Sequence, residues 1–216
     1  MENSSKENTY ERIIQASIKL FNERGERYVT TNHIVAHLGI SPGNLYYYFK
    51  NKEAIIEEIF KRYEKELLAF IGVEVPQTEI EDALHYVGKI FDTMWNYRFI
   101  FMDLGGLFSR SKRLKALQKD YTLNRVEPLI SRYLQALVDK GRLHMSAVDL
   151  KVFKHNFWLL CRYWYSYDKL RSGTLGSTSS ARGSLLALGL LKPYLDEKDK
   201  ETFDEYYSKK FQDMDW

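Results

Sequence analysis

Residues 30–52, TTNHIVAHLGISPGNLYYYFKNK, decide how the amino-terminal part of this chain folds. Apolar residues at helical spacing from Ile34 predict a short helix, which Gly39 ends because glycine tolerates a left-handed backbone. Another short helix follows at once, with Ser41 as its N-cap and Pro42 at its first position. Two short helices joined by so tight a turn predict a helix-turn-helix.

The surface chemistry of this segment suits DNA. No acidic residue occurs between Arg27 and Lys52, so the segment is locally basic and tolerates a phosphate backbone. On the second of the two helices, Leu45 and Phe49 lie one turn apart and are expected to pack inward. A hydrophobic corner with incidental tyrosines is the alternative, but a two-turn helix cannot bury three of them. The outward-facing positions hold Gly43, Asn44, Tyr46, Tyr47 and Tyr48.

Each outward residue type has a chemical use at DNA. Asn44 can pair bidentately with adenine, and Gly43 permits close approach of the backbone. The tyrosines offer hydroxyls to phosphate oxygens and flat faces to sugars or to a thymine methyl group. Thr31 and Lys52 lie at helix starts, where backbone amides favour a bound phosphate. We therefore expect Gly43 and Asn44 to read bases and the other residues to hold the DNA backbone.

The order and spacing of these residues resemble the DNA-binding head of TetR-family repressors, over about residues 10–60. The resemblance implies an Ω-shaped, all-α dimer in which a three-helix head binds a palindromic operator and a larger helical body binds a ligand and dimerises. Two positions depart from the pattern: Val35 stands where such heads usually have alanine, and Tyr48 stands where histidine is common. By matching positions, the resemblance carries DNA contacts over to Thr31, Ser41, Gly43, Asn44, Tyr46, Tyr47, Tyr48 and Lys52.

Helical periodicity continues through the rest of the chain, whereas alternating strand patterns are missing, so we expect an all-α fold. A connecting helix begins at Asn51 and keeps an apolar stripe to Ile71, and a capping box over residues 78–81 opens a second domain. We expect residues 1–72 to form the head with its connecting helix, and residues 73–216 to form the body. Further helices are expected over 114–140 with a kink at Pro128, over 147–170, over 180–195, and around Phe203, Tyr207 and Phe211, with a loop over 172–180.

The body is rich in large aromatic side chains, which together favour a cavity for an apolar or aromatic small molecule. Ordinary helical core is the alternative for each residue taken singly. Residues 95–108 also resemble the body of one subgroup of the family. The pair Gly105 and Gly106 is expected to break helices there and to create a mobile segment that transmits effector binding. The predicted ligand-binding residues are Trp95, Phe99, Met102, Phe108, Tyr121, Phe157, Cys161 and Trp164.

A nearly all-apolar helical stretch, residues 157–165 (FWLLCRYWY), predicts a dimer interface, because both of its sides must be covered by protein. With residues 185–191, where Ala187 and Gly189 allow close approach, it is expected to form a four-helix bundle across a twofold axis. Burial of the stretch within one subunit is the alternative. The predicted interface residues are Trp158, Tyr165, Leu186 and Leu190.

Charge and cysteine content argue against several other classes of protein. The net charge of +3 is small for a protein that coats nucleic acid or an anionic membrane, and no segment is apolar for long enough to span a bilayer. The single cysteine, Cys161, cannot form an internal disulfide, and no Cys/His cluster has metal-ligand spacing. We therefore expect a cytoplasmic protein without a metal, a cofactor or a membrane partner.

An enzyme and an architectural DNA-binding protein are the competing functions. The sequence holds no nucleophile–base pair, phosphate loop or metal constellation, so we expect no catalysis. An architectural protein would share the head but would not need an aromatic body, so a cavity in the body discriminates against it. The expected function is a dimeric one-component regulator, a repressor, that leaves its double-stranded DNA operator when a small effector binds.

Overall fold

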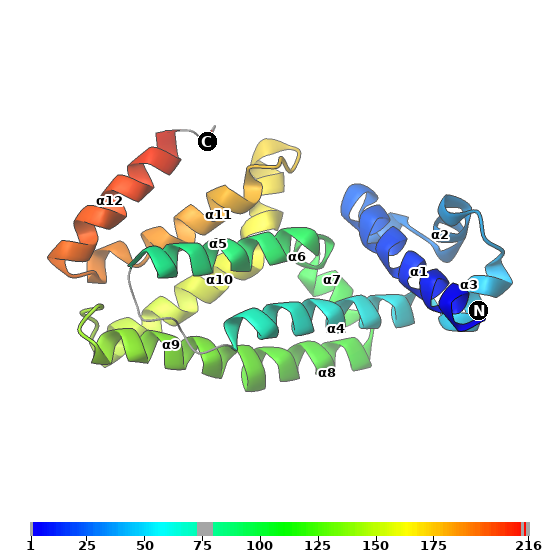
Figure 1. Cartoon of the computed structure of the whole chain (residues 1–216), viewed down its shortest axis with the longest axis horizontal. Helices are drawn as coiled ribbons and strands as arrows, with labels where there is room; N and C mark the ends of the chain where they lie inside the picture. Colours follow the sequence, from blue (N-terminus) through cyan, green and yellow to red (C-terminus); the bar gives the residue numbers. More distant parts are fainter. Residues whose placement is uncertain (1, 73–79, 213, 215–216) are drawn as a thin grey trace.

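Helices make up nearly all of the regular structure in the computed structural model, which describes residues 2–72, 80–212 and 214 (Figure 1). Within those ranges, the one extended pairing is an isolated antiparallel bridge between Leu143 and Leu195, which confirms the all-α prediction. None of the helices described there is both long and apolar enough to cross a membrane. In chain order the elements are α1 (Glu2–Arg24), η1 (Glu26–Tyr28), α2 (Thr31–Leu38), α3 (Pro42–Tyr48), α4 (Lys52–Ile71), α5 (Ile80–Asn96), α6 (Phe99–Met102), α7 (Leu104–Ser109), α8 (Lys112–Asp120), η2 (Tyr121–Val126), α9 (Glu127–Asp139), α10 (Ala147–Ser172), α11 (Ser179–Gly189), η3 (Lys192–Tyr194) and α12 (Glu197–Gln212).

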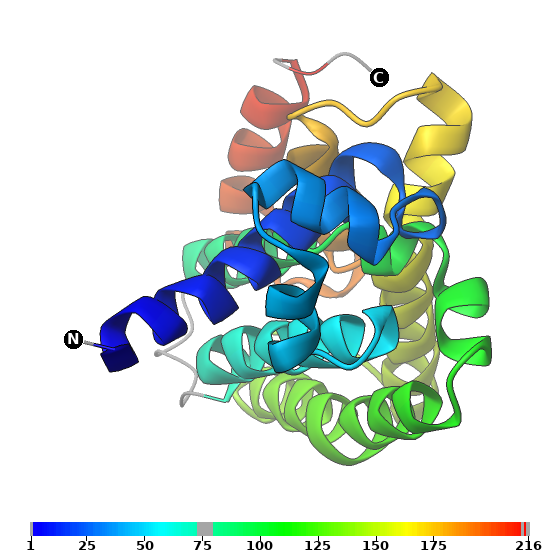
Figure 2. The ribbon, with the colours of Figure 1, turned by 90° about the vertical axis from the view of Figure 1, so that its right-hand side faces the viewer.

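The head consists of α1, η1, α2 and α3, and it has a small, closed core. Seen from the head end of the molecule, these elements lie in front of the body (Figure 2). Ile13, Leu20, Ile34 and Leu45 are buried, as their helical spacing predicted. Ser17 is buried with them because its hydroxyl donates to the carbonyl oxygen of Ile13 at 2.7 Å.

Side-chain caps fix the start of each helix around the turn. Ser41 caps α3 and Asn51 caps α4, as predicted, and each side chain accepts from a backbone amide in the first turn. Thr30 caps α2 through the amide of His33, whose ring nitrogen accepts in return from the Thr30 amide at 3.2 Å. Gly39 ends α2 with a φ of 65°, the left-handed conformation expected of it. The turn between α2 and α3 is therefore specified by residues within it.

The helix α4 joins the head to the body. It contacts α1 in the head and then α5 and η2 in the body, lying alongside α8 and α9 (Figure 1). Near its middle, the Arg62 guanidinium is bound to both carboxylate oxygens of Glu11, at 2.7 Å each, which ties α4 to α1. The middle of α4 is therefore anchored to the head as well as to the body.

In the body, α11 packs against α5, α10 and α12. The backbone of α11 approaches its neighbours closely at Gly183, where a side chain would overlap Phe91 and Trp164. A buried ion pair at 2.7 Å, between Asp168 of α10 and Arg182 of α11, fixes the same junction. Because the carboxylate of Asp168 is fully buried, this pair specifies how α10 and α11 meet.

The helix predicted over residues 114–140 is divided into α8, a π-helical turn (η2) and α9. The predicted irregularity is present, but it lies just before Pro128 and not at it. Pro128 has no amide hydrogen, and its ring crowds the carbonyl group of Asn124 one turn earlier. The wider turn, in which the Glu127 amide donates to the carbonyl oxygen of Thr122, accommodates that crowding.

The helix break predicted at Gly105 and Gly106 lies instead at Asp103, just before them in the chain. Asp103 separates α6 from α7, and its carboxylate caps α7 by accepting from the amide of Gly106 at 3.1 Å. Both Gly105 and Gly106 lie inside α7. Thr78, the capping residue of the box predicted over residues 78–81, lies outside the described part of the chain.

Candidate nucleic-acid interface and body cavity

The outer surface of α3 is open. Asn44, Tyr46 and Tyr47 are exposed, and the exposed fraction of Tyr47 reaches 70%. On the opposite side, Leu45 and Phe49 are buried in the head, as predicted. Since a large aromatic side chain gains little from standing in water, this arrangement indicates a surface shaped for a partner.

Hydrogen bonds hold this surface in place. The Ser41 hydroxyl accepts from the amide of Asn44 at 3.2 Å, which anchors the first turn of α3. The hydroxyl oxygens of Thr31 and Tyr46 are 3.2 Å apart, so the start of α2 is linked to the outer face of α3. A side chain added at Gly43 would meet only the Ser41 hydroxyl, at 3.9 Å, so the backbone there is open to close approach.

Tyr48 differs from the other two tyrosines. It is half-buried, with its ring edge-on to Tyr10 of α1 at a centroid distance of 6.1 Å. Tyr47 lies edge-on against it at 5.0 Å. The prediction of three exposed tyrosines is therefore wrong for Tyr48, because the last turn of α3 rotates this residue toward α1. From this position it supports the ring of Tyr47 from behind.

Lys52 is satisfied within the head. Its ammonium lies 2.7 Å from a carboxylate oxygen of Glu26 and donates to the carbonyl oxygens of Glu26 and Val29 at 3.0 Å each. The argument that a cation at the start of a helix needs a bound phosphate is wrong here, because a buried carboxylate compensates its charge. A direct phosphate contact would have to compete with these three partners.

Glu26 also receives a cation from the body. Arg110, which follows α7, forms an ion pair with the other carboxylate oxygen of Glu26. Beside it, Arg27 pairs with Asp103 at the start of α7. A side chain at Gly106 would overlap both partners of that second pair, so its absence makes room for the contact. Two ion pairs thus connect η1 of the head to the ends of α7.

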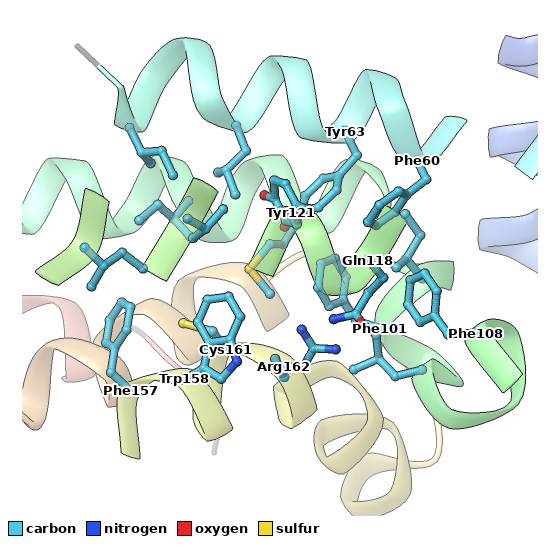
Figure 3. Close-up of a pocket in the computed structure, with 18 residues that line it drawn as sticks. Phe60, Tyr63, Phe101, Phe108, Gln118, Tyr121, Phe157, Trp158, Cys161 and Arg162 are labelled. Atoms are coloured by element: carbon cyan, nitrogen blue, oxygen red, sulfur yellow. The ribbon is translucent and has the colours of Figure 1, made fainter. Parts of the chain in front are cut away.

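A cavity lies inside the body, lined by α4, α5, α7, η2 and α10 among others (Figure 3). Of the residues predicted to bind a ligand, Phe108, Tyr121, Phe157 and Cys161 line it. The free space is only about 40 Å³, enough for a few water molecules. Ligand sites for drug-sized molecules are roughly 300 Å³ or larger, so such a ligand requires the walls to move apart.

Four predicted ligand-binding residues do not line this cavity: Trp95, Phe99, Met102 and Trp164. Trp164 donates its indole hydrogen to the carbonyl oxygen of Ser179 at 2.7 Å and so joins α10 to the start of α11. Phe99 packs on Phe21 at 5.1 Å between ring centroids, and both lie with Met102 around a groove at the junction with the head. Trp95 remains half-buried on α5.

Sequence reasoning missed two groups of lining residues. Phe60 and Tyr63 enter the cavity from α4, although they were treated only as the stripe of a connecting helix. That stripe was a usable signal, since an apolar face that continues beyond the head must meet the body. Gln118 and Arg162 bring polar groups into the wall, and no local pattern distinguishes them from surface residues.

The structure packs the four residues predicted for the dimer interface in or against the core of their own subunit. Tyr165 is fully buried within the subunit and donates to the carbonyl oxygen of Phe91 at 2.7 Å, while Trp158 lines the cavity. Leu186 and Leu190 are half-buried against the core of their own chain. An apolar stripe is instead exposed along α10, formed by Val148, Val152, Leu159, Tyr163, Tyr167 and Leu170.

Small residues of α11 likewise serve contacts inside the chain. Ala187 is fully buried, and a side chain at Gly189 would approach the hydroxyl of Tyr207 on α12 to 3.2 Å. Tyr207 stacks between Phe203 and Phe211, as the predicted stripe near the carboxyl end required. The close approach expected between subunits is therefore wrong for Ala187, which has no exposed surface, whereas for the half-buried Gly189 it stays a prediction.

Comparisons with known proteins match both parts of the chain. Residues 13–59 match the family described as bacterial regulatory proteins, tetR family, and residues 62–203 match that described as bacterial transcriptional repressor, TetR. A crystal structure of a TetR-family transcriptional regulator from Marinobacter aquaeolei VT8 is 36% identical with a TM-score of 0.84, covering 94% of this chain and 98% of that one. The TetR-family protein CprB of S. coelicolor A3(2) shares the fold at 16% identity, with a TM-score of 0.70 over 97% of this chain and 100% of that one. The transposon Tn10 TetC protein of Escherichia coli is 23% identical over 83% of this chain and 88% of its own.

Proposed function

Since this chain belongs to the TetR family of bacterial transcriptional regulators, a family of DNA-binding proteins and not of enzymes, we propose that it is a dimeric repressor that a small effector releases from a palindromic operator. The observation that carries the proposal is the open face of α3, held on a capped frame whose apolar side is buried. In this proposal Gly43 and Asn44 meet base edges in the major groove. The phosphates and sugars are contacted by Thr31, Ser41, Tyr46 and Tyr47.

Tyr48 and Lys52 take supporting roles in this proposal. Tyr48 packs between Tyr10 and Tyr47 and so orients the exposed ring. Lys52 ties the start of α4 to η1 through Glu26. Their substitution would therefore weaken DNA binding by loosening the head, without removing a contact that reads sequence.

The exposed stripe of α10 supports dimerisation. Leu159, Tyr163 and Tyr167 recur at four-residue spacing and are each more than half exposed, so they form one continuous apolar face. Monomeric proteins rarely leave such a face in water. Packing this face against its symmetry mate across a twofold axis would cover it and would set two heads side by side for a palindromic site.

The cavity supports release by an effector. Phe60 and Tyr63 of α4 form part of its wall, and α4 continues without a break back to Lys52 beside α3. An effector that enlarges the present 40 Å³ of free space must displace some of its walls, and a shift of α4 moves the head with it. The effector then shifts the population of heads away from the spacing that fits the operator.

Selection from a random-sequence DNA library tests the DNA-binding proposal. We expect the recovered sites to be twofold symmetric, with half-sites roughly 34–36 Å apart or somewhat more. Asn44→Ala should relax the preference at one base pair per half-site, a change of about 1–3 kcal/mol in discrimination. Asn124→Ala, on the exposed side of η2, is the matched control and should leave the preference unchanged. Recovery of no preferred sequence would contradict the proposal.

Sedimentation and transcription test the remaining parts. Leu159→Asp should convert the dimer into a monomer at micromolar concentration, whereas Leu123→Asp, at an exposed leucine outside the stripe, should not. Purified protein should reduce transcription from a promoter that carries the selected operator. Increased transcription would show that the protein is an activator and not a repressor. Sedimentation of the unsubstituted protein as a monomer would refute the proposed dimer.

A further inference from the structure

The body cavity contains one cationic group without an anionic partner, and we propose that the effector is a monocarboxylic acid with an apolar body, whose carboxylate pairs with Arg162. This inference rests on the proposed function, since it names the chemical class of the molecule that the cavity binds. Figure 3 shows the guanidinium of Arg162 directed from α10 into the cavity, toward Gln118.

The partners of Arg162 are neutral. With the Gln118 amide turned so that its oxygen faces the guanidinium, that oxygen accepts from both terminal nitrogens, at 2.9 and 2.8 Å. The Thr122 hydroxyl accepts from one of them at 3.3 Å, and the guanidinium lies 5.5 Å from the ring centroid of Trp158. Among the described residues, no carboxylate forms an ion pair with Arg162, although twelve other ion pairs occur there.

A guanidinium in an apolar wall is costly unless a counter-charge compensates it. Burial lowers the pKa of Arg162, which reflects poor solvation of its charge. Amide and hydroxyl dipoles compensate only part of that loss. A carboxylate would add two parallel charge-assisted hydrogen bonds, which suit the fork of an arginine. The binding of an anion is therefore favoured over that of a neutral molecule of the same shape.

A second polar group faces the same cavity. The hydroxyl of Tyr121 is buried beside the hydroxyl of Tyr63, and among the described residues it completes no hydrogen bond of good geometry. Burial raises the pKa of Tyr121 far above its usual range, so the phenol stays protonated and offers a donor. A buried donor without an acceptor costs free energy, which an oxygen-bearing ligand would recover.

The rest of the cavity wall determines the chemistry of the part of the ligand that lies away from its carboxylate. Phe60, Met94 and Leu104 are typical of the lining, which is almost entirely aliphatic and aromatic apart from the groups named above. Such a wall binds an alkyl chain or an aromatic ring. Since Arg162 is the sole full charge in the described lining, a single negative charge is balanced, whereas the second charge of a phosphate monoester would remain unpaired.

Calorimetry on the full-length dimer, with matched pairs of carboxylates and alcohols, tests this inference. The probes are hexanoate with hexanol, decanoate with decanol, and naphthoate with naphthalenemethanol. We expect at least one carboxylate to bind about tenfold or more tightly than its alcohol. Equal affinity of the two members of each pair, or no binding of any carboxylate, would overturn the inference.

Two substitutions locate the charge. Arg162→Gln should remove the tenfold preference for the carboxylate while leaving the affinity for the alcohol nearly unchanged. Arg162→Lys keeps a cation and should retain part of the preference. Arg132→Gln, at an exposed arginine of α9, is the matched control and should retain all of it. Retention of the full preference by Arg162→Gln, with a normal melting curve, would place the carboxylate elsewhere and refute the assignment.

The operator selected above separates this inference from the function on which it rests. A carboxylate that binds through Arg162 and weakens operator binding supports both. A carboxylate that binds through Arg162 but leaves operator affinity unchanged supports the site and contradicts release by an effector. An alcohol that binds as tightly as its matched carboxylate and releases the operator supports the proposed function. It overturns the inference that the effector is a carboxylic acid.

Discussion

In the head, each helix around the turn starts on a side-chain cap and the core is closed, whereas the body arranges large aromatic rings around open space. Thr30, Ser41 and Asn51 hold the head together through bonds that span three residues. Phe60 and Tyr121, by contrast, meet across the body at 5.7 Å between ring centroids and leave a cavity beside them. A head built in this way presents a fixed surface, and a body built in this way can change its volume.

Truncating one leucine in each region gives the largest expected difference. Leu45→Ala should destabilise the protein by roughly 2–5 kcal/mol, because Leu45 is fully buried in a core that cannot collapse further. Leu104→Ala should cost less, near the lower end of that range, because Leu104 already borders free space. Urea denaturation measures both. Equal losses would show that the body is as tightly packed as the head.

Adding one methyl group tests where the body is closed. Gly183→Ala should destabilise by about 1–3 kcal/mol, because the new methyl group would overlap Phe91 and Trp164. Gly105→Ala is the matched control at an exposed position of α7, where a side chain meets nothing within 4 Å. It should be neutral or stabilise by up to about 1 kcal/mol, since alanine favours helix. A destabilised Gly105→Ala with an unaffected Gly183→Ala would reverse this assignment.

Removing a serine cap in each region should lower the free energy of unfolding by similar amounts but should affect operator binding differently. Ser41→Ala and Ser111→Ala each remove a hydroxyl that accepts from a backbone amide, at 3.2 and 3.1 Å. Each should destabilise by about 1 kcal/mol in thermal unfolding. Only Ser41→Ala should also weaken operator binding, because its helix carries Asn44. Weakened binding by Ser111→Ala would show that the stability of the body alone controls affinity.

The head could be predicted from sequence because its decisive contacts are local. Gly39 and Ser41 act on residues within four positions of themselves, so a short window contains both cause and effect. The interpretation went wrong where a distant element intervened. Glu26, which lies 26 residues before Lys52, compensates the charge of that lysine. No pattern within residues 30–52 predicts this contact.

The body could be predicted in kind but not in detail. Aromatic abundance indicated a cavity, yet which rings face it depends on how each helix is rotated. Trp158 lines the cavity and Trp164 does not, although both belong to one apolar stretch of α10. Contacts with α11, such as the hydrogen bond from Trp164 to Ser179, set that rotation. Such contacts join elements whose pairing the sequence pattern does not specify.

Cutting one connection between the two regions should have the smallest effect on stability. Arg110→Gln removes the ion pair from the body to Glu26, yet Lys52 still compensates that carboxylate. Because Arg110 is substantially exposed, the cost should stay below about 1 kcal/mol. The measurement that matters is the ratio of operator affinities without and with the ligand that binds most tightly in the calorimetric series.

We expect that ratio to fall several-fold in Arg110→Gln, a loss of about 0.5–2 kcal/mol of coupling. The physical reason is that α7 contributes Leu104 and Phe108 to the cavity wall. The residues that flank α7, Asp103 and Arg110, form ion pairs with η1 of the head. A ligand that displaces α7 therefore moves η1 through these ion pairs as well as through α4. Arg125→Gln, which breaks a comparable pair with Asp120 inside the body, should leave the ratio unchanged. An unchanged ratio in Arg110→Gln would show that the ion pair between Arg110 and Glu26 carries no part of the coupling, which would then run through α4 and the pair between Arg27 and Asp103.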